Sequence, residues 1–297
     1  MKMGQLIKLQ DYISRYEEDL AAYTTRFILF KRRRWERLKQ WWESAREAGA
    51  PGAGNRADGD AGFSPPPFPE ESVMAQRSGR LAADPGTAEK SASLEALKKA
   101  FLNDLFELQI KWASSTAAKI SYVDRSYYRD GHLKFLMQRF PDTFLCLYKP
   151  VFLLKKAPVE AEIVLITPVE LLCLSFLEEE EDAIYIASSE KFWLKRAGER
   201  EEKIVNPFLA LNRTEAIVRR LLKEYGIGFP VTKTVVASNG YIDYPSASFG
   251  QETVDRLNYE SWFQRLRNLR SPLKHEQLKA ARALLRHCHS VYLPRQR

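Results

Sequence analysis

The sequence lacks any apolar run long enough to span a bilayer, and this shortage is the first constraint on function. Its longest apolar stretches, such as residues 171–177, are far shorter than the roughly 20 residues that a membrane helix needs. The N-terminus, MKMGQLIKLQ, is followed by charged residues and has no apolar core of the signal-peptide kind. We therefore predict no transmembrane segment and a cytoplasmic location.

Cysteine and histidine are scarce as well. The three cysteines, Cys146, Cys173 and Cys288, are odd in number and lie in apolar or helical segments, which predicts reduced packing residues without disulfides. His287 and His289 are two residues apart, so on a helix their rings point in different directions and make a poor metal site. The sequence also contains no glycine-rich phosphate loop. It thus names no certain cofactor.

Acidic residues are nearly absent from one end of the chain. Residues 261–297 hold nine lysines and arginines and one acid, Glu276, so this segment carries the net charge of +8. A neutral body with a basic tail favours contact with a polyanion such as nucleic acid, although a solvated basic helix that only aids solubility is the alternative. The candidate nucleic-acid-binding residues of this tail are Trp262, Arg265, Arg267, Arg270, Lys274, Lys279, Arg282 and Arg286.

The N-terminal segment, residues 1–48, predicts one long helix. Its apolar residues alternate spacings of three and four, a heptad pattern that favours packing against a partner helix. These positions are Leu6, Leu9, Ile13, Tyr16, Leu20, Tyr23, Phe27 and Phe30. A second helix is predicted within residues 93–125, so the two can close as a hairpin. The alternative is an intermolecular coiled coil, with a homo-oligomer or another protein as partner.

Between the two helices, residues 49–92 contain seven of the 14 glycines and six of the 15 prolines. This composition cannot bury enough apolar surface to offset the ordering of the chain, which predicts a flexible linker.

Residues 126–250 change to a pattern of strands with one central helix. We predict strands at residues 144–155, 162–167, 171–177, 183–187 and 232–237, with a helix that starts at Asn206-Pro207. The turn Ser238-Asn239-Gly240 predicts a hairpin into residues 241–244. Basic helices complete the chain over residues 251–297. This order predicts an α/β sandwich with a long-helix hairpin before it and helices after it.

The strand pair in residues 159–181 is the most informative stretch. Glu162 precedes the first strand, and Pro168 lies in the tight turn between the two. Metal-dependent nucleases need carboxylates for Mg²⁺ and usually a lysine for the attacking water. A carboxylate on one strand and an acid-x-Lys triplet on its antiparallel neighbour would share one sheet face. Here the triplet position reads Ser175-Phe176-Leu177.

In this order of elements the chain resembles the nuclease-related domain (NERD) family, in its Gram-positive bacterial type. This family is a branch of the PD-(D/E)xK restriction-endonuclease-like superfamily. The resemblance rests on AEIVLITPVELLCLSFLE, on the tryptophan of Ser189-Glu190-Lys191-Phe192-Trp193 and on Asn206-Pro207. It implies a restriction-endonuclease-like mixed sheet and a site at Glu162, in the place of the family's first strand aspartate.

The same resemblance implies a degenerate active site. Ser175 occupies the acid position of the triplet and Leu177 its lysine position, and neither side chain can do that work. Asp130, Glu178 and Lys191 are the candidate replacements, and Glu162 is the one metal ligand to be considered, for Mg²⁺, if activity survives.

Together these observations predict a decayed nuclease that serves as a DNA-binding or scaffolding module, a pseudonuclease. An active Mg²⁺-dependent DNA nuclease and a coiled-coil interaction protein are the alternatives. Whether the chain is an enzyme is left open, with the missing triplet counting against it.

Overall fold

The computed structural model describes residues 1–47, 93–155, 157–177, 180–244 and 250–295. The chain forms two compact units, one made of Met1–Thr24 with Gln109–Arg297 and the other of Thr25–Leu108. The predicted linker, residues 49–92, lies outside the described residues.

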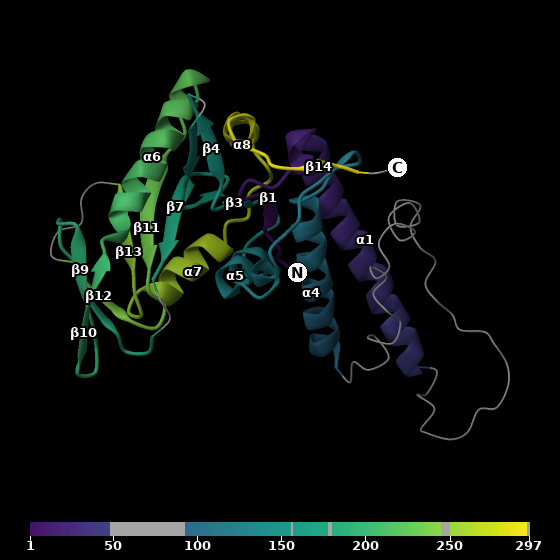
Figure 1. Ribbon diagram of the computed structural model, residues 1–297. Coiled ribbons are helices and arrows are strands. Elements are labelled where there is room, and N and C mark those ends of the chain that lie inside the picture. The colour runs from purple at the N-terminus through teal and green to yellow at the C-terminus, as the bar shows by residue number, and fades with distance from the viewer. Residues whose placement is uncertain (48–92, 156, 178–179, 245–249, 296–297) are drawn as a thin grey trace. The chain divides into compact units, whose positions relative to one another are not determined.

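The first unit is organised around a six-stranded mixed sheet (Figure 1). The strand order is β1-β3-β6-β7-β11-β13, in which β6 is antiparallel to both of its neighbours, β3 and β7, and all other neighbouring strands are parallel. The bounds are β1 Gln5–Leu9, β3 Leu145–Tyr148, β6 Ile163–Ile166, β7 Leu171–Phe176, β11 Val231–Val236 and β13 Gln251–Val254. The predicted antiparallel pair around Pro168 is therefore present as β6 and β7.

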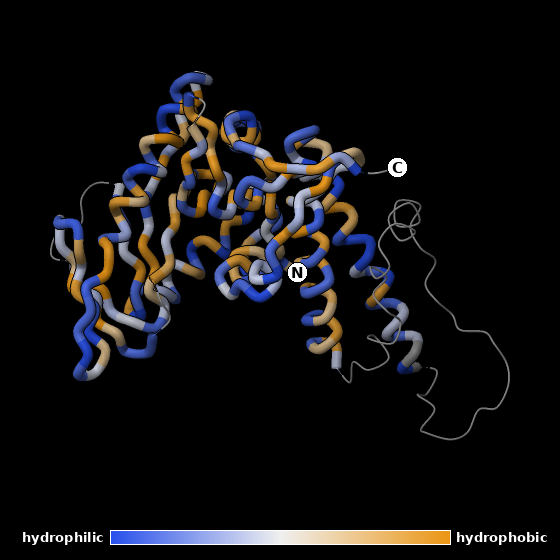
Figure 2. Tube along the Cα trace, viewed as in Figure 1, coloured by the Kyte–Doolittle hydropathy of each residue, from blue (hydrophilic) through white to orange (hydrophobic). Residues whose placement is uncertain are grey.

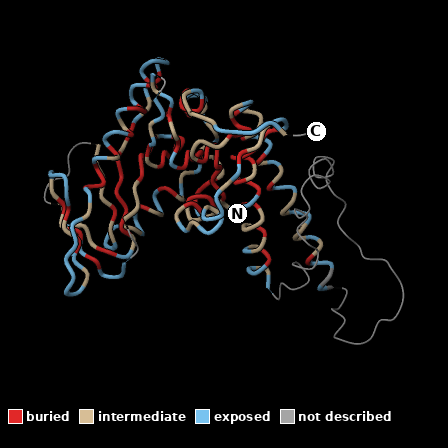
Figure 3. Tube along the Cα trace, in the orientation of Figure 1, coloured by how far each residue is buried: buried red, intermediate tan, exposed pale blue. Residues whose placement is uncertain are grey.

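The centre of this sheet is the core of the unit. Every residue of β1, β3 and β6 is buried, as are the first four of β7 (Figure 3). Strands covered on both faces are expected to be continuously apolar. This explains why runs such as Ile163–Ile166 show no polar alternation.

Four helices of this unit follow or flank the sheet: α5 Gly131–Arg139, α6 Pro207–Glu224, α7 Tyr259–Arg267 and α8 His275–Arg286. Helix α6 lies along β7 and β11 (Figure 1) and alternates apolar and polar residues around its axis (Figure 2). Asn206 caps α6 by accepting the N–H of Phe208, and Pro207 occupies its first turn. The predicted start at Asn206-Pro207 is confirmed.

A second, four-stranded sheet has the order β10-β9-β8-β12. Its strands are β8 Ile184–Ile186, β9 Phe192–Ala197, β10 Arg200–Val205 and β12 Tyr241–Asp243. The predicted hairpin at Ser238-Asn239-Gly240 is wrong, because β12 leaves β11 and pairs in parallel with β8. Gly240 permits this crossing, since a Cβ there would lie 2.6 Å from the carbonyl oxygen of Ala183.

Two short antiparallel pairs complete the first unit. Strand β4 (Val151–Leu154) pairs with β5 (Ala157–Glu160), and β2 (Lys119–Ile120) pairs with β14 (Leu293–Pro294).

The predicted long helix over residues 1–48 needs correction. Leu6 and Leu9 lie in strand β1, and the 3-10 helix η1 (Arg15–Glu17) follows, with a capping box between Ser14 and Glu17. Helix α1 begins at Leu20 and ends at Glu47. Spacings of three and four in a short apolar segment fit a doubly covered strand as well as a helix, so the pattern alone could not separate them.

The second unit consists of the remaining parts of α1 and of α4, which spans Leu94–Trp112. Within it, the rings of Trp35 and Phe101 are 5.3 Å apart between centroids, and Trp42 and Leu97 form a buried cluster. These two helices therefore contact each other inside one chain. The second predicted helix is shorter than residues 93–125, because it ends at Trp112.

The fold is thus α/β with mixed sheets, and the described residues include six α-helices. None of the helices in the described part of the chain is both long and apolar enough to cross a membrane.

Candidate functional site

The strand pairing decides what surrounds Glu162. Because Ile163 is paired with Leu174 in an antiparallel register, the preceding residue, Glu162, lies opposite Ser175. Both side chains are half-buried. The predicted juxtaposition of Glu162 with the serine of the triplet is therefore present. Leu177 comes directly after β7, and its N–H donates a hydrogen bond to the carbonyl of Val236.

Helix α6 fixes the backbone at this point. The N–H of Glu162 donates to the hydroxyl of Thr214 over 2.9 Å, and that hydroxyl donates to the carbonyl of Ala210 over 3.0 Å. Thr214 is fully buried. Glu162 is consequently held between the sheet and α6, with its position set by one buried hydroxyl.

The carboxyl of Glu162 lies in a mixed electrostatic environment. Burial raises its pKa from the ordinary value near 4.5, while the positive charges of Lys149 and Arg213 oppose the shift and Glu160 adds to it. Lys149 and Arg213 are both exposed. Neither forms an ion pair with another residue of the described chain, so both cations remain available to an anion beside the carboxyl.

This arrangement suits phosphate and not a divalent metal. Ser175 and Leu177 bring no carboxylate to Glu162, and two of the three charges that act on its carboxyl are cations, Lys149 and Arg213, which would repel Mg²⁺. Among the described residues, no group of three or more His, Cys, Asp or Glu side chains could hold a metal ion. The residues therefore do not fit the Mg²⁺ that the nuclease resemblance implies.

The other predicted catalytic residues do not gather at Glu162. Asp130 caps α5 by accepting the N–H of Leu133, and its second oxygen accepts the hydroxyl of Tyr148 over 2.6 Å. The register places Tyr148 opposite Ile163, so alternation puts Asp130 on the other face of the sheet from Glu162.

Lys191 is exposed just before β9 of the second sheet, with its ammonium 5.3 Å from the ring centroid of Phe192. Glu178 lies outside the described residues.

The predicted nucleic-acid-binding residues fall into three groups. Trp262 is only 3% exposed and packs against Phe140, so its ring is not free to stack on a base. Arg265 is bound to the carboxylates of Glu252, over 2.6 Å, and Glu170, over 3.5 Å. Arg267 is half-buried. The remaining residues are exposed: Arg270, Lys274, Lys279, Arg282 and Arg286.

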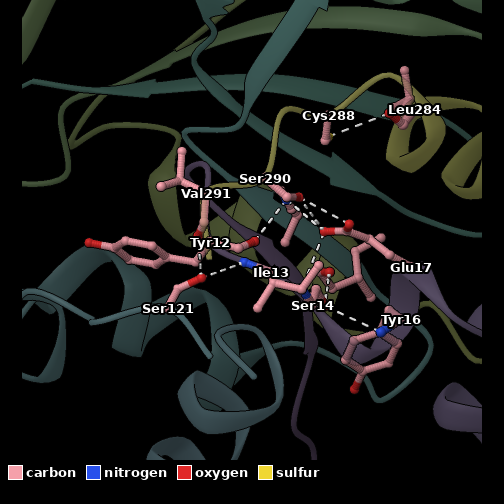
Figure 4. A network of polar contacts seen from close by, with 12 residues as sticks. Tyr12, Ile13, Ser14, Tyr16, Glu17, Ser121, Leu284, Cys288, Ser290 and Val291 are labelled. Carbon is pink, nitrogen blue, oxygen red and sulfur yellow. Dashed lines mark hydrogen bonds and ion pairs between the residues drawn. The ribbon is translucent and has the colours of Figure 1, made fainter. Parts of the chain in front are cut away.

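A second polar centre was missed in the sequence. Lys8 is fully buried in β1, and its ammonium donates to Glu17 and Ser290 over 2.6 Å each and to the carbonyl of Tyr12 over 2.8 Å. Figure 4 shows the surrounding network, in which the hydroxyl of Ser290 points at the Glu17 carboxylate. A lysine among apolar neighbours in one strand is the only sequence signal that could have revealed it.

This lysine and serine do not form a catalytic pair. The three hydrogens of the Lys8 ammonium all have acceptors, on Glu17, Ser290 and the carbonyl of Tyr12, and the hydroxyl of Ser290 donates to Glu17 and not to the lysine. The network instead ties β1 and η1 to the segment after α8.

No known family model matches the chain, and no solved structure matches it. A curated protein of Geobacillus stearothermophilus named RNA 2',3'-cyclic phosphodiesterase is 37% identical over 113 residues. The match covers 36% of this chain and 36% of that protein, so the chain spans little more than a third of the relative's length.

This relative corrects the functional prediction. A pseudonuclease for DNA binding or scaffolding is contradicted, together with its alternatives of a DNA nuclease and a coiled-coil interaction protein, because the relative's name points to a phosphodiesterase of RNA. The absence of the acid-x-Lys triplet predicts a degenerate nuclease site. The geometry at Glu162 instead contains different groups, one carboxyl and two cations.

Proposed function

We propose that the chain hydrolyses a phosphodiester bond of an RNA cyclic phosphate at Glu162. One observation carries this proposal: a half-buried carboxyl of raised pKa lies within the field of two exposed cations, Lys149 and Arg213, that have no ion-pair partner in the described chain. A perturbed carboxyl beside charge partners is typical of acid–base sites. The name of the partial relative supports the substrate class.

The roles follow from the chemistry of the groups. Arg213 offers the planar donors that bind phosphate oxygens, and Lys149 adds a point charge. Ionised Glu162 takes a proton from water as the water oxygen attacks phosphorus. In-line displacement puts the leaving ribose oxygen on the opposite side, where Lys149 is the candidate donor of its proton. The P–O bond of the ring breaks, and the product is a phosphomonoester.

The test is hydrolysis of a nucleoside 2',3'-cyclic phosphate by the full chain, with the monoester product quantified by chromatography. Glu162→Gln keeps the shape of the side chain and removes the base, so we expect kcat to fall by about 10²- to 10⁴-fold. Arg213→Gln should mainly raise KM. Glu202→Gln is the matched control, because Glu202 is an exposed carboxylate in β10 of the second sheet and should retain full activity. Equal activity of the Glu162 and Glu202 variants would refute the assignment.

We also propose the finer fold type, restriction-endonuclease-like, for the six-stranded sheet, and with it the NERD resemblance. The order of α5, three antiparallel strands, α6 and the parallel strand β11 supports it. An experimental structure that overlays these elements on a restriction endonuclease with a different strand order would refute this proposal.

Two exposed basic residues of the tail, Arg270 and Lys274, are proposed to contact the RNA backbone. Affinity for a single-stranded oligonucleotide should then fall steeply with salt, and replacing Arg270 and Lys274 with glutamine should reduce that slope by about one unit or more. A slope unchanged by the substitutions would exclude these two residues.

A further inference from the structure

A cavity of about 500 Å³ lies between the start of α1 and helix α8, and Glu162 is not among the residues that line it. Its volume is in the range of small-molecule sites. The walls come from two segments that are distant in sequence: one contains Tyr16, Glu18 and Asp19, and the other contains Arg282, Leu285 and Arg286. Glu17 and Cys288 line the cavity as well, and Figure 4 shows both side chains together with Ser290 of the Lys8 network.

One wall is basic. Arg282 and Arg286 are four residues apart on α8, so their side chains share one face of the helix. Both are exposed, and neither is ion-paired with a described residue. Lys279, on the same helix, differs because it pairs with Glu276 over 2.9 Å. Two neighbouring guanidinium groups without carboxylate partners are suited to the oxygens of one phosphate.

The other wall is acidic and contains Glu17, Glu18 and Asp19. These carboxylates differ in how many of their oxygens already accept hydrogen bonds from the protein. Glu17 is engaged by Lys8 and Ser290. Glu18 and Asp19 are exposed; one oxygen of Asp19 accepts the N–H of Ala22, which leaves the other for a ligand. Carboxylates accept hydrogen bonds from hydroxyl groups, as acidic residues do with ribose in dinucleotide sites.

The apolar lining residues offer little surface. Tyr16, Leu20 and Leu285 are 1%, 3% and 5% exposed, respectively. No broad apolar wall is therefore available for a planar base, and recognition falls to the charged side chains. The occupant that fits is polar throughout, with an anionic end and several hydroxyl groups.

We propose that this cavity binds a ribose phosphate. The phosphate lies against Arg282 and Arg286, and the sugar hydroxyls donate to Glu18 and Asp19. The ligand is either a free sugar phosphate or the terminal ribose phosphate of an RNA chain, in which case the base projects into solvent. The site is separate from Glu162 and does not depend on hydrolysis there.

The first experiment is isothermal titration calorimetry of the full chain with ribose 5-phosphate. We expect saturable binding that weakens by about tenfold or more in the double variant Arg282→Gln/Arg286→Gln, because two charge-assisted hydrogen-bonding groups are lost. Lys279→Gln, on the same helix, should bind as the native chain does. Binding by the double variant at native affinity would overturn the proposal, provided that its thermal unfolding matches the native chain.

Further titrations separate the ligand sources. Inorganic phosphate should bind more weakly than ribose 5-phosphate, and Glu18→Gln should narrow the difference. Equal affinities for the two would overturn the role of the carboxylates. Tighter binding of a nucleoside 3'-monophosphate would assign the site to RNA ends, and tighter binding of ribose 5-phosphate to free sugar phosphates. The Glu162→Gln variant should bind normally while failing to hydrolyse, so that failure of either proposal can be recognised separately.

Discussion

Glu17 and Glu162 lie in the same unit at the edges of its core, yet their surroundings are opposite. Glu17 is held by an ammonium at 2.6 Å and by a serine hydroxyl at 3.0 Å. Glu162 is fixed through its backbone N–H, and its carboxyl faces two cations that form no ion pair with it. A saturated carboxylate stabilises the fold, whereas an incompletely partnered carboxyl of raised pKa is suited to chemistry.

The largest effect is expected when Glu17 loses its cationic partner, Lys8. Lys8→Met should destabilise the protein by about 3–5 kcal/mol, because a largely buried carboxylate is left without its countercharge. Urea unfolding followed by circular dichroism measures the change. The double variant Lys8→Met/Glu17→Leu should recover much of the loss, and a single variant of native stability would show that the pair contributes nothing.

A smaller effect is expected where Glu162 is anchored. Thr214→Val preserves the size of the side chain but leaves the N–H of Glu162 and the carbonyl of Ala210 without this hydroxyl. We expect a loss of about 1–3 kcal/mol in unfolding free energy, together with reduced hydrolysis because the carboxyl is no longer positioned. Thr214→Ser is the control that restores the hydroxyl and should restore both properties. Loss of activity in the serine variant as well would point to packing instead.

Substitution of Glu162 itself should change the pH dependence more than the stability. Burial raises its pKa, so the folded protein holds this proton more tightly than the unfolded chain does. The resulting stabilisation is present at low pH and is lost as pH rises from the ordinary value through the raised one. Glu162→Gln should therefore gain in melting temperature relative to the native chain as the pH rises above the ordinary pKa near 4.5. A difference that stays constant with pH would contradict the raised pKa.

The smallest effect concerns the reactivity of the three cysteine thiols towards alkylation. Burial raises the pKa of the Cys288 thiol to about 12 and raises those of Cys146 and Cys173 as well. Cys146 and Cys173 are fully buried and Cys288 is half-buried, so few thiolates are available for alkylation. We expect negligible labelling by iodoacetamide under native conditions and three labelled sites in denaturant. Rapid native labelling would show that these residues are not core packing.

Local patterns predicted most of the elements between Gly131 and Arg286. The strand pair around Pro168 and the helix at Asn206-Pro207 are set by neighbours in sequence, so periodicity and capping residues found them. Strand β1 could not be found in this way, because its apolar spacing is also that of a helix and its identity depends on pairing with β3, about 140 residues later. The partners of Tyr241–Asp243 were missed for the same reason.

The residues of the candidate site also differ in whether local sequence could predict them. Glu162 and its position opposite Ser175 follow from strand alternation, a local rule. No sequence pattern marked Lys149 or Arg213 as site residues. Lys149 lies in a bend after β3 and Arg213 on α6, and only their electrostatic effect on Glu162 in the folded chain gives them a role. Trp262 was misjudged because an aromatic residue in a basic helix can face either solvent or core, and here it faces the core.

Composition and short-range periodicity were enough to predict the α/β class, the strand pair at Glu162 and the concentration of positive charge near the C-terminus. Tertiary structure alone decided which charges meet. It buried Lys8 against Glu17, placed Arg282 and Arg286 across a cavity from Glu18 and Asp19, and brought two cations to Glu162. The interaction energy of two charges depends on the distance between them, and residues far apart in the sequence come close to each other only when the chain folds.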